Sequence, residues 1–162
     1  MAGIGNFRPD RTSVWENFSM KILVLNGPNL GRLDLRDSKI YGDLDFASLT
    51  KIIVDAGKEF GLECVVRQSD SEVEMISWLH EAADKNIPVV INPAAFTHYS
   101  YAIRDAADMV SAPLIEVHLS NPMSREEFRH TSVISGVANG TVAGFGPDSY
   151  RLALIAISRM LK

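Results

Sequence analysis

The sequence predicts an α/β protein built on a parallel sheet with helices on both faces. Short apolar runs, typical of strands buried on both sides, alternate with segments whose apolar residues recur at helical spacing. No internal repeat or low-complexity tract interrupts this alternation. The chain has 162 residues, 46% of them hydrophobic, which is enough for one domain with a substantial core. We therefore expect a single domain over residues 20–162, behind an N-terminal extension at 1–19.

The first half of this domain supplies two strands and one helix. Residues 22–26 are a short apolar run bounded by turn-forming residues, which predicts a strand. Asp45 can cap a helix over 46–60, because apolar residues recur there at helical spacing and Gly61 provides a stop. The apolar run at 62–67 predicts the second strand.

The second half supplies three strands and three helices. Ser71 and Glu74 match a capping box that opens a helix. Four of its apolar residues are expected to face inward, namely Val73, Ile76, Leu79 and Ala83. Further strands are expected over 87–92, 113–116 and 137–145, and further helices over 101–110 and 148–161. Five strands separated by helices favour a doubly wound, flavodoxin-like sheet, although one sequence does not fix the strand order.

Composition argues against several classes of protein. The formal net charge of −4 disfavours nucleic acid or a membrane surface as the main partner. No window approaches the roughly 18 consecutive apolar residues of a membrane-spanning helix. The single Cys64 excludes an internal disulfide and fits a reducing, cytoplasmic compartment. Residues 1–19 lack the features of a signal or transit peptide, so we expect a mobile extension unless one of its aromatic residues docks.

Polar groups gather where the predicted strands end. One apolar run ends in a carboxylate, an imidazole, a hydroxyl and an amide, all within residues 116–121. Ligands of open α/β sheets collect at the carboxyl ends of the strands, so we interpret this stretch as a site. After the third strand, small residues at 93–95 allow a ligand to approach the backbone. The sequence leaves open whether His98, which follows them, is structural or functional.

The connection over 27–42 is longer than a compact domain normally needs. Such loops are usually lids or disordered spacers. This one carries cationic and phenolic side chains, namely Arg32, Arg36, Lys39 and Tyr41. Closure of a lid would bring positive charge and a tyrosine over the strand ends, and the alternative is a solvated polar loop.

Five blocks of this sequence resemble one enzyme family, type II 3-dehydroquinate dehydratase. They lie at 25–30, 67–72, 91–98, 116–121 and 125–130, in the family's order and spacing. The resemblance implies a flavodoxin-like fold and reversible dehydration of 3-dehydroquinate to 3-dehydroshikimate, in the shikimate pathway of aromatic amino acid biosynthesis or in quinate catabolism. It also implies no metal or organic cofactor, and a dodecamer built from trimers in which a neighbouring subunit closes part of each site.

By this resemblance four residues carry catalysis. Removing water from a β-hydroxy ketone needs a base beside the carbonyl, a stabiliser for the enolate and an acid for the departing hydroxyl. Tyr41 matches the base, and Arg36, on the same loop, matches a lid arginine whose charge would favour the phenolate. Asn29 matches the group that stabilises the enolate oxygen, and His118 matches the general acid.

The resemblance also assigns the groups that bind the substrate. Asn92 and the backbone N–H groups of Leu119 and Ser120 match the pocket for the substrate carboxylate. His98 and Arg129 match groups that contact the ring hydroxyls.

Glu116, Asp105 and Arg125 match supporting residues. We place Glu116 on the opposite face of an ideal strand from His118, so that coupling would need a bent strand end or a second histidine such as His98. For Asp105 and Arg125, an ion pair at the surface or at a subunit interface is an equal alternative.

The chain departs from the family pattern at places that bear on the site. The lid at 33–38 lacks the family's glycine and proline, which changes its closing geometry. Ala94 and Ala95 stand where the family usually has a glycine, so a residue there must avoid positive φ or accept strain. None of these residues is assigned to proton transfer, so we expect the same reaction. The altered lid keeps open a catalytically silent paralogue that acts in ligand binding or assembly.

Overall fold

The computed structural model describes residues 19–41 and 43–162, so the expected extension at 1–19 lies outside the described residues apart from Ser19. Within these residues the sheet has five parallel strands in the order β2-β1-β3-β4-β5. The strands are β1 (Met20–Asn26), β2 (Leu62–Gln68), β3 (Val89–Asn92), β4 (Leu114–His118) and β5 (Gly140–Ala143). This order confirms the predicted flavodoxin-like topology, in which the winding direction reverses between β1 and β3.

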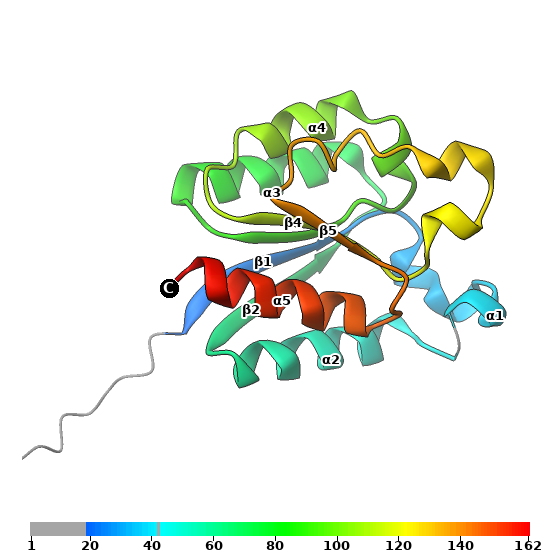
Figure 1. Ribbon diagram of the computed structural model, residues 1–162, viewed down its shortest axis with the longest axis horizontal. Coiled ribbons are helices and arrows are strands. Elements are labelled where there is room, and N and C mark those ends of the chain that lie inside the picture. Colours follow the sequence, from blue (N-terminus) through cyan, green and yellow to red (C-terminus); the bar gives the residue numbers. More distant parts are fainter. Residues whose placement is uncertain (1–18, 42) are drawn as a thin grey trace, which may run out of the picture.

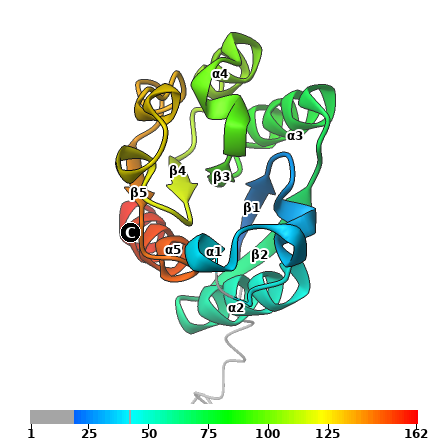
Figure 2. The ribbon, with the colours of Figure 1, turned by 90° about the vertical axis from the view of Figure 1, so that its right-hand side faces the viewer.

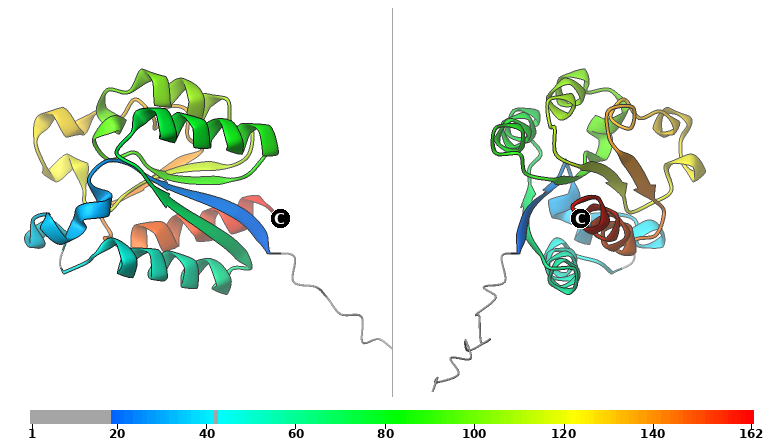
Figure 3. Two further views of the ribbon diagram at one scale, coloured as in Figure 1. Left: turned by 180° about the vertical axis from the view of Figure 1, so that it is seen from behind. Right: turned by 60° about the vertical axis from the view of Figure 1, so that its left-hand side comes forward.

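Helices cover both faces of the sheet. One face carries α2 (Phe46–Glu59) and α5 (Asp148–Met160), and the other carries α3 (Glu72–Lys85) and α4 (Tyr101–Asp108) (Figures 1 and 3). Successive side chains of β1 point to opposite faces, so Ile22 and Val24 join one core and Leu23 and Leu25 join the other. In the described part of the chain, no helix is long and apolar enough to cross a membrane.

Short helices gather at the edge of the sheet where the strands end (Figure 2). They are the 3₁₀ helices η1 (Leu30–Leu35), η2 (Ala94–His98), η3 (Pro122–Ser124) and η4 (Glu127–His130), and the single turn α1 (Ser38–Tyr41). The connection over 27–42, expected to be a lid or a solvated polar loop, therefore contains η1 and α1. η1 consists of two 3₁₀ turns joined by a kink at Arg32, and Leu30 and Leu33 on either side of the kink are both buried in the core.

The ends of α2 follow the sequence closely. The Asp45 carboxylate accepts a hydrogen bond from the backbone N–H of Ser48 at 2.7 Å, as expected of an N-cap. Gly61 follows the helix with φ of 72°, a conformation that glycine adopts without a steric penalty. Both features depend only on residues within the helix and beside it, which is why the sequence predicts them.

The inward face of α3 differs from the prediction. Its buried residues are Met75, Leu79 and Ala82, whereas Val73 is 72% exposed. The four-residue and three-residue steps from Met75 to Ala82 define a stripe that leaves Val73 on the solvent side of the first turn. The prediction is confirmed for Leu79 and Ile76, which pack in the core, and is wrong for Val73, because two apolar stripes run along this helix and only the packing against the sheet selects one of them.

Candidate active site

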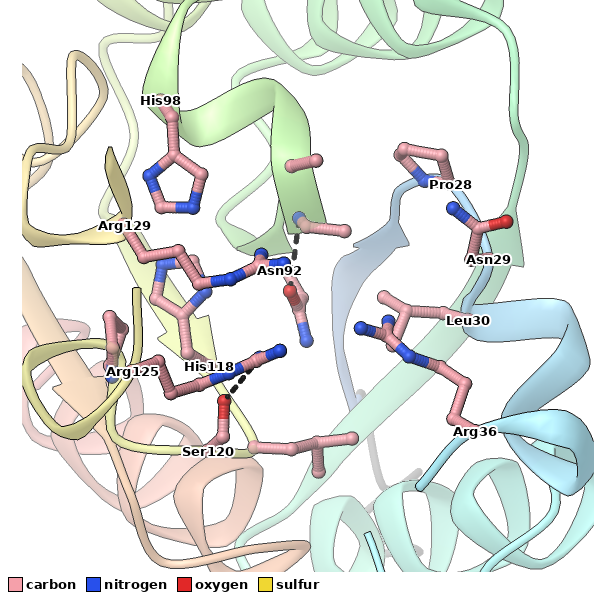
Figure 4. Close-up of a pocket in the computed structure, with 14 residues that line it drawn as sticks. Pro28, Asn29, Leu30, Arg36, Asn92, His98, His118, Ser120, Arg125 and Arg129 are labelled. Carbon is pink, nitrogen blue, oxygen red and sulfur yellow. Dashed lines mark hydrogen bonds between the residues drawn. The ribbon is translucent and has the colours of Figure 1, made fainter. Parts of the chain in front are cut away.

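A pocket of about 120 Å³ opens at the carboxyl edge of the sheet, lined by segments that follow β1, β3 and β4 (Figure 4). Most residues that the sequence assigns to the site line it, namely Asn29, Arg36, Asn92, His98, His118, Leu119, Ser120, Arg125 and Arg129. The lining also includes residues that were given no role, namely Pro28, Leu30, Ala94, Ala95 and Pro122. The pocket lies where the winding of the sheet reverses, the usual ligand position in this architecture.

A buried carboxylate holds the pocket histidine. Glu116 Oε1 lies 2.7 Å from His118 Nε2, and Glu116 is fully buried. The expectation that the two residues lie on opposite faces was wrong, because residues two apart in a strand share a face. Neither a bent strand end nor His98 is therefore needed to couple them. An ionised carboxylate only accepts hydrogen bonds, so Nε2 donates to Glu116 and Nδ1 is the ring nitrogen that Glu116 does not engage.

Hydroxyl groups complete the surroundings of Glu116. Thr97 donates to Oε1, and Ser132 Oγ lies 2.9 Å from both carboxylate oxygens. The Ser132 oxygen accepts backbone N–H groups from Ile134 at 3.1 Å and Ser135 at 2.9 Å, so its own proton is directed to Glu116. Burial by itself raises the pKa of Glu116, but the hydrogen bonds from the histidine and the hydroxyls outweigh it and hold this pKa below its ordinary value.

Arginine side chains supply positive charge to the pocket. Arg36 reaches in from the side opposite Arg125 and Arg129 (Figure 4). Arg129 Nε donates to Glu126 at 2.8 Å, and Arg125 Nη1 donates to Ser120 Oγ at 3.2 Å. These guanidinium groups gather in a chain whose net charge is −4, so the pocket suits an anionic ligand.

His98 lines the pocket with its ring held by the backbone. Its Nδ1 lies 2.8 Å from the carbonyl oxygen of Thr131, so Nδ1 carries the proton of this hydrogen bond. The ring also packs edge-on against Phe128, with 5.7 Å between ring centroids. Arg129 lies over the same Phe128 ring at 4.6 Å, which ties the histidine and the arginine to one aromatic support.

Asn92 ends β3 with its amide held on both sides. Its Nδ2 donates to the hydroxyl of Tyr150 at 2.9 Å, and its Oδ1 accepts from the backbone N–H of Ala94 at 3.1 Å. The sequence predicts that Ala94 either avoids positive φ or accepts backbone strain. Its φ is 52°, so it accepts the strain. Tyr150 was not among the predicted site residues, because it lies on α5 in an ordinary helical pattern with no polar motif around it.

The turn after β1 is fixed by the loop after β2. Asn29 has φ of 66°, which asparagine tolerates better than most residues, and its backbone N–H donates to Asp70 Oδ1 at 2.8 Å. Asp70 also accepts from Gln68 Nε2 at 3.0 Å. Asp70 and Gln68 belong to the family block at 67–72. The hydrogen bond from Asn29 to Asp70 therefore joins this block to the block at 25–30.

Asp105 lies apart from the pocket, on the exposed side of α4, and pairs with Arg104 at 3.0 Å.

The backbone of Tyr41 ends α1, and its side chain lies outside the described residues. Among the described residues, no group of three His, Cys, Asp or Glu side chains could hold a metal ion. What the described pocket brings together is a histidine suited to proton transfer and cations suited to an anion.

Comparison with known proteins finds one family throughout. A family model described as class II dehydroquinase matches residues 20–158. A 3-dehydroquinate dehydratase of Salinispora tropica is 56% identical over 135 residues, which are 83% of this chain and 94% of that protein. One of Mycobacteroides abscessus is 51% identical, with the same coverage of 83% and 94%. The crystal structure of a type II dehydroquinase from Propionibacterium acnes matches with a TM-score of 0.85 and 52% identity, over 87% of this chain and 97% of that one.

Proposed function

Because this chain belongs to the class II dehydroquinase family and is a 3-dehydroquinate dehydratase, a hydro-lyase, we propose that the pocket described above binds 3-dehydroquinate and removes water through an enolate. The observation that carries this proposal is the buried Glu116 held against His118 at the edge of an arginine-lined pocket. The pair supplies a proton carrier, and the arginines suit a carboxylate substrate.

Proton removal is assigned to Tyr41. A tyrosine has an ordinary pKa near ~10, so a phenolate at neutral pH needs a nearby cation that favours the charged form. Arg36 follows η1, five residues before Tyr41 on the same connection, and its side chain lines the pocket. Asn29, which lines the pocket from the turn after β1, is assigned to the enolate oxygen.

Proton return is assigned to His118. Glu116 holds Nε2, so the proton for the departing hydroxyl comes from Nδ1 of the imidazolium, and water leaves as the conjugated double bond forms. The Glu116 carboxylate holds the ring in the orientation from which this transfer occurs. His98 and Arg129, which share the Phe128 support, are assigned to the ring hydroxyls.

The substrate carboxylate is assigned to Asn92 and to the backbone N–H groups of Leu119 and Ser120. Arg125 supports this wall of the pocket through its hydrogen bond to Ser120. Asp105 lies outside this pocket, so it would support catalysis only by contacting the pocket of a neighbouring subunit. We further propose a cytoplasmic homododecamer built from trimers, serving either aromatic biosynthesis or quinate catabolism.

The rise in ultraviolet absorbance of the conjugated enone product tests the proposal when purified protein meets 3-dehydroquinate. Tyr41→Phe should lower kcat by roughly 100-fold or more, because a general base contributes about 10²–10⁴. Tyr101→Phe, exposed on α4, is the matched control and should keep full turnover. Near-normal turnover in Tyr41→Phe would remove Tyr41 from this role. No turnover in the folded parent protein would instead favour the silent paralogue.

A further inference from the structure

A chain of hydrogen bonds through buried polar side chains joins α5 to the edge of the pocket. The hydroxyl of Tyr150 donates to Asn26 Oδ1 at 2.6 Å and accepts from Asn92 Nδ2 at 2.9 Å. Tyr150 and Asn26 are fully buried, and Asn92 is 3% exposed. Asn26 and Asn92 are the paired last residues of β1 and β3. Of these residues only Asn92 lines the pocket, so Tyr150 and Asn26 reach the ligand through it alone.

Backbone groups at both ends fix the direction of this chain. At one end, Asn26 Nδ2 donates to the carbonyl oxygen of Arg67 at 3.1 Å, which leaves Asn26 Oδ1 to accept. At the other end, the N–H of Ala94 donates to Asn92 Oδ1, which leaves Asn92 Nδ2 to donate. Between them, the hydroxyl of Tyr150 gives its one proton to Asn26 and receives one from Asn92. Burial raises the pKa of Tyr150 well above its ordinary value, so the hydroxyl keeps that proton.

The direction of the chain determines what the pocket meets at Asn92. The amide nitrogen carries two N–H groups, and one of them goes to Tyr150. Within residues 19–41 and 43–162 no hydrogen bond takes the other, which remains for a ligand. A flipped amide would set Nδ2 against the N–H of Ala94, donor against donor, and would lose the hydrogen bond that the observed orientation makes. Asn92 therefore presents a donor, which suits a carboxylate and disfavours a carboxamide that brings N–H donors of its own.

We propose that Tyr150 is a positioning residue for substrate recognition: its hydroxyl holds the Asn92 amide with an N–H toward the pocket and so makes the site selective for the substrate carboxylate. The proposal rests on the proposed function, in which Asn92 binds that carboxylate. Tyr150 acts through Asn92 and touches neither the substrate nor the groups that move protons. A purely structural tyrosine would instead contribute only its ring to the core beneath α5.

Tyr150→Phe tests this, because it removes the hydroxyl and keeps the ring. We expect KM for 3-dehydroquinate to rise roughly tenfold or more while kcat stays within about threefold. The preference for 3-dehydroquinate over its carboxamide, measured as a ratio of kcat/KM, should fall by a similar factor. Asn26→Ala, at the far end of the chain and outside the pocket lining, should produce the same pattern.

Ile157→Val is the matched control, because it removes one methyl group from a fully buried side chain on the same helix and leaves the hydrogen-bonded chain intact. Its KM and its preference should equal those of the parent protein. In folded Tyr150→Phe, an unchanged KM, a loss confined to kcat, or a raised KM with the preference kept would each overturn the proposal. Calorimetric affinities for 3-dehydroquinate and for its carboxamide separate this test from the proposed function. If the parent protein binds 3-dehydroquinate more tightly than the carboxamide but does not dehydrate it, the proposed function fails and the role of Tyr150 stands.

Discussion

A fully buried carboxylate such as Glu116 stays ionised only if hydrogen-bond donors replace the water that it loses. His118, Thr97 and Ser132 are those donors. The orientation of the Ser132 hydroxyl is fixed, because two backbone N–H groups occupy its acceptor positions and leave its proton for Glu116. We infer that this serine, together with His118 and Thr97, keeps Glu116 charged and thereby keeps the His118 ring in one orientation.

Ser132→Ala should therefore weaken catalysis without removing a group that touches substrate. A hydrogen bond to a charged group is worth about 1.5–3 kcal/mol, so kcat should fall roughly 10- to 100-fold. The pKa of Glu116 should rise with the loss of this donor, and the acidic limb of the kcat profile should move to higher pH. Enone absorbance measured across the pH range gives both quantities.

Ser135→Ala is the control for this variant. Ser135 is exposed nearby, and its hydroxyl contacts only the backbone oxygen of Ser132 at 3.4 Å among the described residues. It should keep the parent kcat and the parent pH profile. If Ser132→Ala behaves in the same way as Ser135→Ala, the serine does not support the carboxylate in catalysis.

At the scale of elements, the accuracy of the sequence-based prediction depends on how local each cause is. The strand β1 and the cap at Asp45 depend on neighbouring residues, and both were predicted. The buried stripe of α3 was misassigned at Val73, because only the tertiary packing chooses between two apolar stripes. The family motifs gave the lining of the pocket, whereas Ser132 and Tyr150 lie outside these motifs and support the site through contacts that no local pattern encodes.

The turn from β3 into η2 yields a prediction of its own. Ala94 adopts φ of 52° there, which places its Cβ close to backbone atoms and disfavours every residue except glycine and a few polar ones. Ala94→Gly should raise the free energy of unfolding by about 1 kcal/mol, since the relieved strain exceeds the added entropy of the unfolded chain. Chemical denaturation, with an unchanged m-value as the two-state check, measures this.

Ala95→Gly provides the comparison for that turn. Ala95 is the next residue of η2 and is not among the described residues with positive φ, so glycine there only adds entropy to the unfolded chain. It should leave the protein equally stable or less stable. A stabilisation as large as that of Ala94→Gly, or a destabilised Ala94→Gly, would show that the positive φ at Ala94 carries no strain.

Ionised carboxylates across the protein fall into two groups that respond differently to acid. Arg67 lowers the pKa of Glu81 to about 2, and Arg129 lowers that of Glu126 to about 2, but both ion pairs are partly accessible to solvent, so salt screens them more than it screens a fully buried group. Glu116 is buried among fixed donors, so added salt reaches it poorly. Acid sensitivity that persists in salt should therefore come from Glu116.

The free energy of unfolding should fall as the pH drops below the ordinary glutamate pKa of 4.5. The folded-state pKa of Glu116 lies lower, so its stabilisation is complete above 4.5 and is lost as the pH falls through the folded value. Glu116→Gln should be less stable near neutral pH but should lose less further stability in acid. Urea titrations of the parent protein and of Glu116→Gln at several pH values, in about 0.5 M salt to weaken the partly accessible ion pairs, compare how steeply the two stabilities fall with pH. If the stability of Glu116→Gln falls with pH in parallel with that of the parent protein, the acid sensitivity comes from groups other than Glu116.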